Sequence, residues 1–443
     1  MARCLAQGGA TLTRILRLAS GGDGVGKLED GRTVFVPRTA PGDLVELTGL
    51  RMHARFARAR IAHVVEPGPG RIEPRCRHYL PDECGGCQLQ HLGYDGQLAL
   101  KREIVADALE RIGRLQVVVP PVIPAPDPWG YRSRITLAIA PGRRHAGFHP
   151  LDQAGRVFPL QQCEIAAPAL MRLWEALRPA LHLLPPDAEQ LLLRLDRSGG
   201  LHAVIRSAGT EAWSGGRRLA ESTHARGVVV TVWWQPAQGA PRVMAGDREA
   251  FPATVFEQIH PALADRIRAD ASESLGDVRN MHAWDLYAGI GETTDHLFRL
   301  GATVESVELD RRAVEAGERR WREAAREREE SQRPEPAGIV RHVGRVEEML
   351  SLLHDPGAVI ANPPRAGMEE AVTRELLRRR PRCIVYVSCD PATLARDLGR
   401  LCGAGAQGVS GGSGETPYRI TAVQPYDLFP QTAHIETVVR LEA

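Results

Sequence analysis

Residues 281–310, MHAWDLYAGIGETTDHLFRLGATVESVELD, constrain the fold of this 443-residue chain more than any other stretch. A short apolar run leads to a turn at Gly289 and Gly291, a helical pattern follows, and a second apolar run ends at Glu308 and Asp310. This alternation predicts a Rossmann-like β-α-β unit. The glycines let the backbone approach a ligand, and a carboxylate about twenty residues further on can accept hydrogen bonds from both ribose hydroxyls.

The same loop favours a cationic cofactor over a dinucleotide. It lacks the third glycine of the dinucleotide fingerprint, no pyrophosphate cradle follows it, and it begins with the acidic Asp285. A compact acidic loop suits a sulfonium better than it suits a diphosphate. We therefore expect S-adenosyl-L-methionine to bind here.

The stretch IVYVSCDPATLARD, Ile384 to Asp397, predicts another strand, turn and helix, with Cys389 at the turn. Open α/β sheets carry their chemistry where strands end at the carboxyl edge, so Cys389 is placed to meet a ligand. An isolated cysteine is more often a buried structural residue, and the neighbouring motifs decide against that interpretation. VIANPPRAG brings a further strand to the same edge, where the double proline stiffens the corner and presents Asn362.

Three cysteines, Cys76, Cys84 and Cys87, crowd into twelve residues of a chain that has eight cysteines in all. Eight are too few for a disulfide scaffold in a chain of this length, so the crowding indicates a metal or cluster site. The plausible fourth soft ligand before the last domain is Cys163. Spacing alone leaves a [4Fe-4S] cluster and a four-cysteine zinc site both open.

The first part of the chain predicts a small barrel. Asp-Gly and Pro-Gly turns separate short β-branched runs between about residues 11 and 66. Its last strand carries several arginines, which suit phosphate contacts. An equally weighted interpretation is a solvent-exposed edge strand whose arginines prevent pairing with another chain. Tyr94 to Gly113 predicts an amphipathic helix that a glycine ends, and a mixed α+β pattern follows. The Gly-rich residues 403–415 predict a flexible surface insertion.

Together with the prolines, Cys389 and the ending DLFPQTAHIETVVRLE, these features make the chain resemble the RNA uracil-5-methyltransferase family. These S-adenosylmethionine enzymes make 5-methyluridine in tRNA and ribosomal RNA. The resemblance implies an α/β fold in three parts: a TRAM-like, OB-like β-barrel that binds RNA (1–67), a mixed α+β central domain with the four-cysteine site (68–250) and a Rossmann-like methyltransferase domain (251–443). The [4Fe-4S] cluster is typical of the ribosomal RNA branch and favours 23S rRNA over tRNA as the substrate.

The resemblance also assigns roles to residues. Uracil C5 is a poor nucleophile, so a thiolate must first add to C6, and this role is assigned to Cys389. The base that later removes the C5 proton is Glu436, in HIETVV. The implied cofactor contacts are Gln258, Tyr287, Gly289, Glu308 and Asn362.

The chain departs from the family pattern at three positions in or near these contacts. Asn362 stands where the family usually has Asp, His260, two residues after Gln258, replaces the usual Asn, and Ala288 replaces a common Cys.

Two other functions remain open from the sequence. Amino methylation of a base through Asn362 is disfavoured because Arg365 stands where such enzymes carry an aromatic residue. A non-catalytic RNA-binding iron-sulfur protein is disfavoured by the intact Cys389 and Glu436. A net charge of +2 neither requires nor excludes RNA. No run approaches membrane-spanning length and no export pattern opens the chain, so we expect a cytoplasmic monomer without membrane contact.

Overall fold

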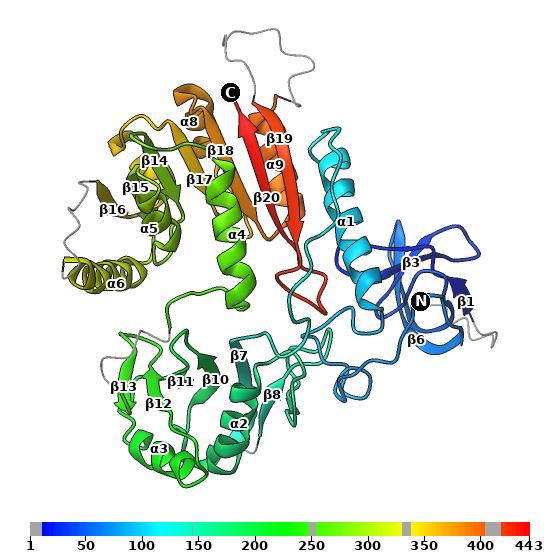
Figure 1. Ribbon diagram of the computed structural model, residues 1–443. Helices are drawn as coiled ribbons and strands as arrows, with labels where there is room; N and C mark the ends of the chain where they lie inside the picture. Colours follow the sequence, from blue (N-terminus) through cyan, green and yellow to red (C-terminus); the bar gives the residue numbers. More distant parts are fainter. Residues whose placement is uncertain (1–10, 144, 248–253, 330–337, 404–417) are drawn as a thin grey trace.

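The computed structural model describes residues 11–143, 145–247, 254–329, 338–403 and 418–443. Within these residues three sheets follow one another along the chain (Figure 1). The predicted Gly-rich insertion lies outside the described residues except for Gly403. No helix of the described part is long and apolar enough to cross a membrane.

The first sheet has the strand order β1-β5-β6-β4-β3-β2. Its small core includes the buried Val34, Val36 and Val45. β6 carries Arg58 and Arg60 and lies between β5 and β4, so the predicted arginine-guarded edge strand is an internal strand. The strands are β1 (Thr11–Arg14), β2 (Arg17–Leu18), β3 (Gly24–Lys27), β4 (Thr33–Val36), β5 (Leu44–Met52) and β6 (Phe56–Glu66).

The middle sheet has the order β13-β12-β11-β10-β7-β8-β9. Leu191 and Leu193 of β10 pack with Leu170 and Trp174 of α2 in one buried core, because alternate residues of a strand face the same side. The elements are β7 (Arg134–Ile139), η1 (Pro141–Arg143), β8 (Ala146–Phe148), β9 (Phe158–Pro159), α2 (Pro168–Leu177), η2 (Arg178–Leu183), β10 (Ala188–Leu195), β11 (Leu201–Ser207), α3 (Gly216–His224), β12 (Thr231–Gln235) and β13 (Arg242–Ala245).

The last sheet has the order β16-β15-β14-β17-β18-β20-β19. Strands β14 to β18 run parallel, and β20 and β19 pair antiparallel beside β18. The strands are β14 (His282–Leu286), β15 (Thr303–Glu308), β16 (Ile339–Val343), β17 (Ala358–Ala361), β18 (Cys383–Ser388), β19 (Arg419–Tyr426) and β20 (Glu436–Glu442). The helices are α4 (Pro261–Ser274), α5 (Glu292–Arg299), α6 (Arg311–Glu329), α7 (Val346–Met349), η3 (Leu350–Leu352), α8 (Glu370–Arg379) and α9 (Pro391–Leu401).

Both faces of this sheet are covered by helices. Ala283 of β14 belongs to the core that includes α4 and α5, whereas Trp284 belongs to the core that includes α8 and α9. The predicted β-α-β unit is confirmed as β14, α5 and β15, and the predicted strand, turn and helix around Cys389 are confirmed as β18 and α9.

Helix α1 (Tyr94–Arg111) packs beside α9 of the last sheet (Figure 1). It ends before Gly113, and its C-cap is Ile112, so the predicted glycine cap is wrong. The glycine is required by packing instead, because a Cβ on Gly113 would lie 2.9 Å from the carbonyl oxygen of Ala395 in α9. The predicted boundaries at 67 and 250 stay predictions.

Candidate active site

Four of the predicted site residues lie at one edge of the last sheet. Because β14, β15, β17 and β18 are parallel, their carboxyl ends meet at the same edge. Tyr287 follows β14, Glu308 ends β15, Asn362 follows β17 and Cys389 follows β18. The backbone N–H of Asn362 donates to the carbonyl of Leu286 at 3.2 Å, which holds the Asn-Pro-Pro corner against the end of β14.

The glycine loop holds the carboxylate of Glu308 in place. The Gly289 N–H donates to Glu308 Oε2 at 2.8 Å, and the Asp310 N–H donates to Oε1 at 2.8 Å. Gly289 has a φ of 56° and Gly291 a φ of 76°, and a Cβ on Gly291 would lie 1.9 Å from Arg341 Nη1. The loop therefore requires these glycines, and each carboxylate oxygen keeps a further lone pair for a ligand hydroxyl.

Asp285 does not face the loop as the sequence suggested. It lies within β14, is 2% exposed, and accepts a hydrogen bond from Thr294 Oγ1 of α5 at 2.5 Å. Burial raises its pKa to about 6. Asp285 thus joins the strand to the helix beneath the loop. Tyr287, which follows it, adopts a φ of 63°, and burial raises the pKa of its hydroxyl.

Cys389 and Glu436 meet at the end of β18. Ser388 pairs with Thr437 in the antiparallel register of β18 and β20, so the first residue of β20 lies beside the residue that follows β18. The pKa of Cys389 is raised to about 11, first by burial and then by the charge of Glu436, whereas Arg365 opposes the rise by its charge and by a hydrogen bond. The structure therefore brings the predicted nucleophile and base together with a cation.

Glu436 is enclosed and lacks a full set of partners. It is 2% exposed, and its Oε2 has no hydrogen-bond partner among the described residues. Burial raises its pKa from 4.5 to about 8. A carboxyl group with a pKa near the operating pH suits general acid-base chemistry.

Sequence reasoning left two neighbours of Cys389 without definite roles. Asp390 is the N-cap of α9, since its Oδ1 accepts from the N–H groups of Ala392 and Thr393 at 3.0 and 2.9 Å. The carbonyl of Arg365 accepts from Thr393 Oγ1 at 3.1 Å, which fixes the NPPR corner to α9. The cap pattern Asp-Pro was readable in the sequence, whereas the contact of Arg365 with Cys389 was not.

Gln258 lies in the half-buried segment that leads into α4. Its neighbours join this segment to the middle sheet: Ile259 O accepts from Ser133 N at 2.8 Å, and Glu257 forms an ion pair with Arg194. Glu257 also lines a cavity of about 650 Å³ together with Ile290 of the glycine loop. The segment of Gln258 therefore borders the same space as the loop after Gly289.

The four predicted metal ligands Cys76, Cys84, Cys87 and Cys163 line one cavity of about 420 Å³. Each of them is a free cysteine. Burial raises the pKa of each thiol, and neighbouring thiols add to the rise at Cys84, Cys87 and Cys163; the pKa of Cys84 reaches about 12. Four unpaired thiols in one buried pocket fit a soft metal or cluster, which stabilises thiolates that burial disfavours.

Comparisons with known proteins identify similar families and relatives. The family model for tRNA (uracil-5-)-methyltransferase matches residues 337–443, and the model for the TRAM domain matches residues 12–62. An uncharacterized RNA methyltransferase of Thermosynechococcus vestitus is 32% identical, over 98% of each chain. One of Listeria monocytogenes is 29% identical, over 96% of this chain and 95% of the relative.

A solved structure has a similar fold. The crystal structure of the Pyrococcus abyssi tRNA (uracil-54, C5)-methyltransferase in complex with S-adenosyl-L-homocysteine superposes with a TM-score of 0.66 at 23% identity. The match covers 97% of this chain and 100% of the other.

Proposed function

This chain belongs to the S-adenosylmethionine-dependent RNA uracil-5-methyltransferase family, and on that premise we propose that it methylates carbon C5 of one specific uridine through a covalent adduct of Cys389. The observation that carries the proposal is the meeting of Cys389, Glu436 and Arg365 at the carboxyl edge of the sheet. A thiol beside a cation and a buried carboxyl group is the set of groups that addition, methyl transfer and elimination require.

The cofactor would lie against the glycine loop. When bound, S-adenosylmethionine supplies an electrophilic methyl group on its sulfonium. Glu308 would accept hydrogen bonds from the ribose hydroxyls. Backbone N–H groups already hold its carboxylate in position at the tip of β15. Tyr287, Gly289 and Asn362 border the same edge, and Gln258 would approach from the segment before α4.

Cys389 would begin the reaction by adding its thiolate to C6 of the uracil, which moves the C5–C6 electron pair into an enolate. Arg365 stabilises the thiolate by its charge and its hydrogen bond. After C5 has taken the methyl group, the carboxylate of Glu436 takes the C5 proton. The C5–H electron pair then re-forms the C5–C6 double bond, and the C6–S bond breaks to return the Cys389 thiolate.

The four cysteines would hold a [4Fe-4S] cluster. Among the described residues, no three of their sulfurs gather within 4.8 Å of one another. A single zinc ion would require sulfurs roughly 3.8 Å apart, because Zn–S bonds measure about 2.3 Å. The wider arrangement supports the larger cluster, which favours 23S rRNA as the substrate. We further propose that the protein acts as a cytoplasmic monomer.

The test compares Cys389→Ala with Cys402→Ala, a matched change of a half-buried cysteine at the end of α9. Cells that lack the gene receive either variant, and 5-methyluridine is measured by mass spectrometry in separated 23S rRNA and tRNA. We expect Cys402→Ala to restore 5-methyluridine in 23S rRNA and Cys389→Ala to leave it absent. Restoration by Cys389→Ala would refute the mechanism.

The same measurement separates the alternatives. Recovery of 5-methyluridine in tRNA instead of 23S rRNA would show that tRNA is the substrate. Loss of a different methylated base from cells without the gene would support amino methylation through Asn362.

A further inference from the structure

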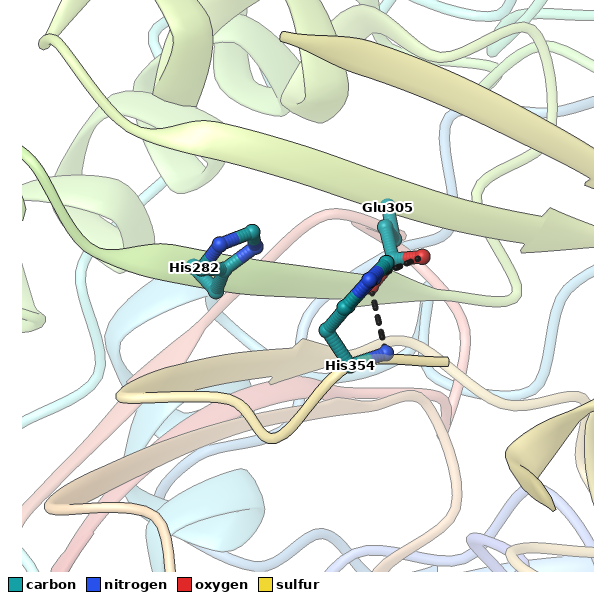
Figure 2. Close-up of side chains that lie close together, drawn as sticks. All are labelled: His282, Glu305 and His354. Atoms are coloured by element: carbon teal, nitrogen blue, oxygen red, sulfur yellow. Dashed lines mark hydrogen bonds and ion pairs between the residues drawn. The ribbon is translucent and has the colours of Figure 1, made fainter. Parts of the chain in front are cut away.

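Two histidines and a glutamate meet on the last sheet, away from Cys389 (Figure 2). His282 is the first residue of β14, Glu305 lies within β15, and His354 follows η3. The ligand atoms of these three side chains all lie within 4.8 Å of one another. Since β14 runs from His282 toward the glycine loop, His282 lies at the opposite end of the strand from the reaction edge.

The carboxylate of Glu305 is buried and lacks a permanent positive partner. Its side chain is 5% exposed, and its ion-pair partners in the described part of the chain are two histidines, His342 and His354, with no Lys or Arg. Oε1 lies 3.3 Å from His354 Nδ1 and 3.6 Å from His342 Nε2. A buried carboxylate requires a compensating charge, and a bound cation supplies one.

His342 provides a second, independent observation. Its Nε2 is buried and has no hydrogen-bond partner in the part of the chain that the structure describes, although it lies 3.6 Å from Glu305 Oε1. An imidazole that faces a metal-ligating carboxylate is a common outer-sphere arrangement, and it orients the carboxylate toward the ion. The orphaned nitrogen therefore fits a site in which Glu305 turns to bind a cation.

The backbone around His354 is already held in position. Its N–H donates to Glu305 Oε2 at 2.9 Å, and its carbonyl accepts from Trp284 Nε1 at 2.9 Å. Arg379 donates to the preceding carbonyl, that of Leu353, at 2.7 Å. The segment is thus fixed before any ion binds, which lowers the entropy cost of binding.

The two histidine side chains remain accessible and adjustable. The side chain of His354 is 74% exposed, His282 is exposed, and the ring centroids lie 5.4 Å apart. Zinc with bonds of about 2.0–2.1 Å requires tetrahedral ligand atoms roughly 3.3 Å apart. His354 Nδ1 and Glu305 Oε1 already have this spacing, so rotation of exposed rings completes the set.

We propose that His282, Glu305 and His354 bind a zinc ion, with the fourth position open to water. Two imidazoles and one carboxylate suit a borderline transition metal such as zinc, whereas magnesium and calcium prefer all-oxygen sites. The ion would join the segment after η3 to β14 and β15 and would neutralise the buried Glu305. Its place at the opposite end of β14 from the glycine loop separates it from the proposed methylation site.

The test is a calorimetric titration of the full chain, with its cysteine site unchanged, by zinc chloride. It compares the wild type, His282→Ala, His354→Ala and the matched control His224→Ala, an exposed histidine at the end of α3. We expect the wild type and His224→Ala to bind one zinc ion more per chain than either site variant. Equal zinc stoichiometry in all four proteins would overturn the proposal.

Thermal unfolding gives a second readout that does not depend on activity. Zinc at about a hundred times its dissociation constant would raise the melting temperature of the wild type by about 5 °C. His282→Ala removes an exposed side chain, so in chelator this variant unfolds at the wild-type temperature and gains nothing from zinc. His354→Ala also removes an ion-pair partner of Glu305, so its melting temperature is compared with and without zinc, and it too gains nothing. A zinc-dependent rise that persists in both variants would place the ion elsewhere.

Discussion

Replacement of Glu436 by glutamine tests the buried carboxyl group at the centre of the proposed mechanism. Burial raises the pKa of Glu436 from 4.5 to about 8, so the folded protein holds a proton that the unfolded chain releases between these pH values. The stability that this proton contributes is complete below pH 4.5 and is lost as pH rises to about 8. One pKa unit corresponds to about 1.4 kcal/mol, so the loss reaches about 5 kcal/mol.

Glu436→Gln removes this pH dependence without a change of shape, because the amide is neutral at every pH. We expect the free energy of unfolding of the variant to exceed that of the wild type by an amount that grows by about 1.4 kcal/mol for each pH unit between about 5 and 8. Urea unfolding at four pH values measures the gap, and Glu110→Gln, at an exposed position of α1, is the matched control. If the free energy of unfolding changed with pH in the same way for the wild type and Glu436→Gln, the assignment of a raised pKa to this group would be refuted.

The remaining predictions concern Arg365, the buried ion pair and the cysteine site. Arg365→Ala should slow alkylation of Cys389 by iodoacetamide several-fold, because the arginine lowers the pKa of that thiol, and an unchanged rate would remove Arg365 from this role. Lys101→Met should lower the free energy of unfolding by about 3–5 kcal/mol, measured with urea, since it leaves Asp427 fully buried without its cation. An unchanged free energy of unfolding would contradict the ion pair. Cys163→Ser should abolish the visible absorbance of an iron-sulfur cluster, and wild-type absorbance would exclude Cys163 as a ligand.

Local patterns in the sequence were sufficient to predict the reaction edge. Apolar runs that end at turns, followed by helical periodicity, predicted β14, α5, β15, β18 and α9, and parallel strands must place their carboxyl ends together. Glu308, Asn362 and Cys389 could therefore be assigned to one edge before any coordinates were known. Turn chemistry and strand periodicity are short-range properties, so a single sequence contains them.

The pairing of Cys389 with Glu436 required the tertiary structure or a family resemblance. No local pattern shows that β20 inserts antiparallel between β18 and β19, and that insertion places Glu436 beside Cys389. The raised pKa of Glu436 likewise depends on burial by segments distant in sequence.

Packing between distant segments explains why the sequence predictions for single residues were wrong. It also creates the proposed zinc site. Asp285 is an acidic residue in the sequence but a buried strand-to-helix link in the structure, and Gly113 serves the contact of α1 with α9 in place of a helix cap. His282, Glu305 and His354 lie on three separate segments and share no motif. The sequence determined which residues carry chemistry at the ends of strands, because strand and turn preferences act over a few neighbours. Only the tertiary structure decided which of them meet and which are buried, because burial and long-range contacts depend on how whole elements pack.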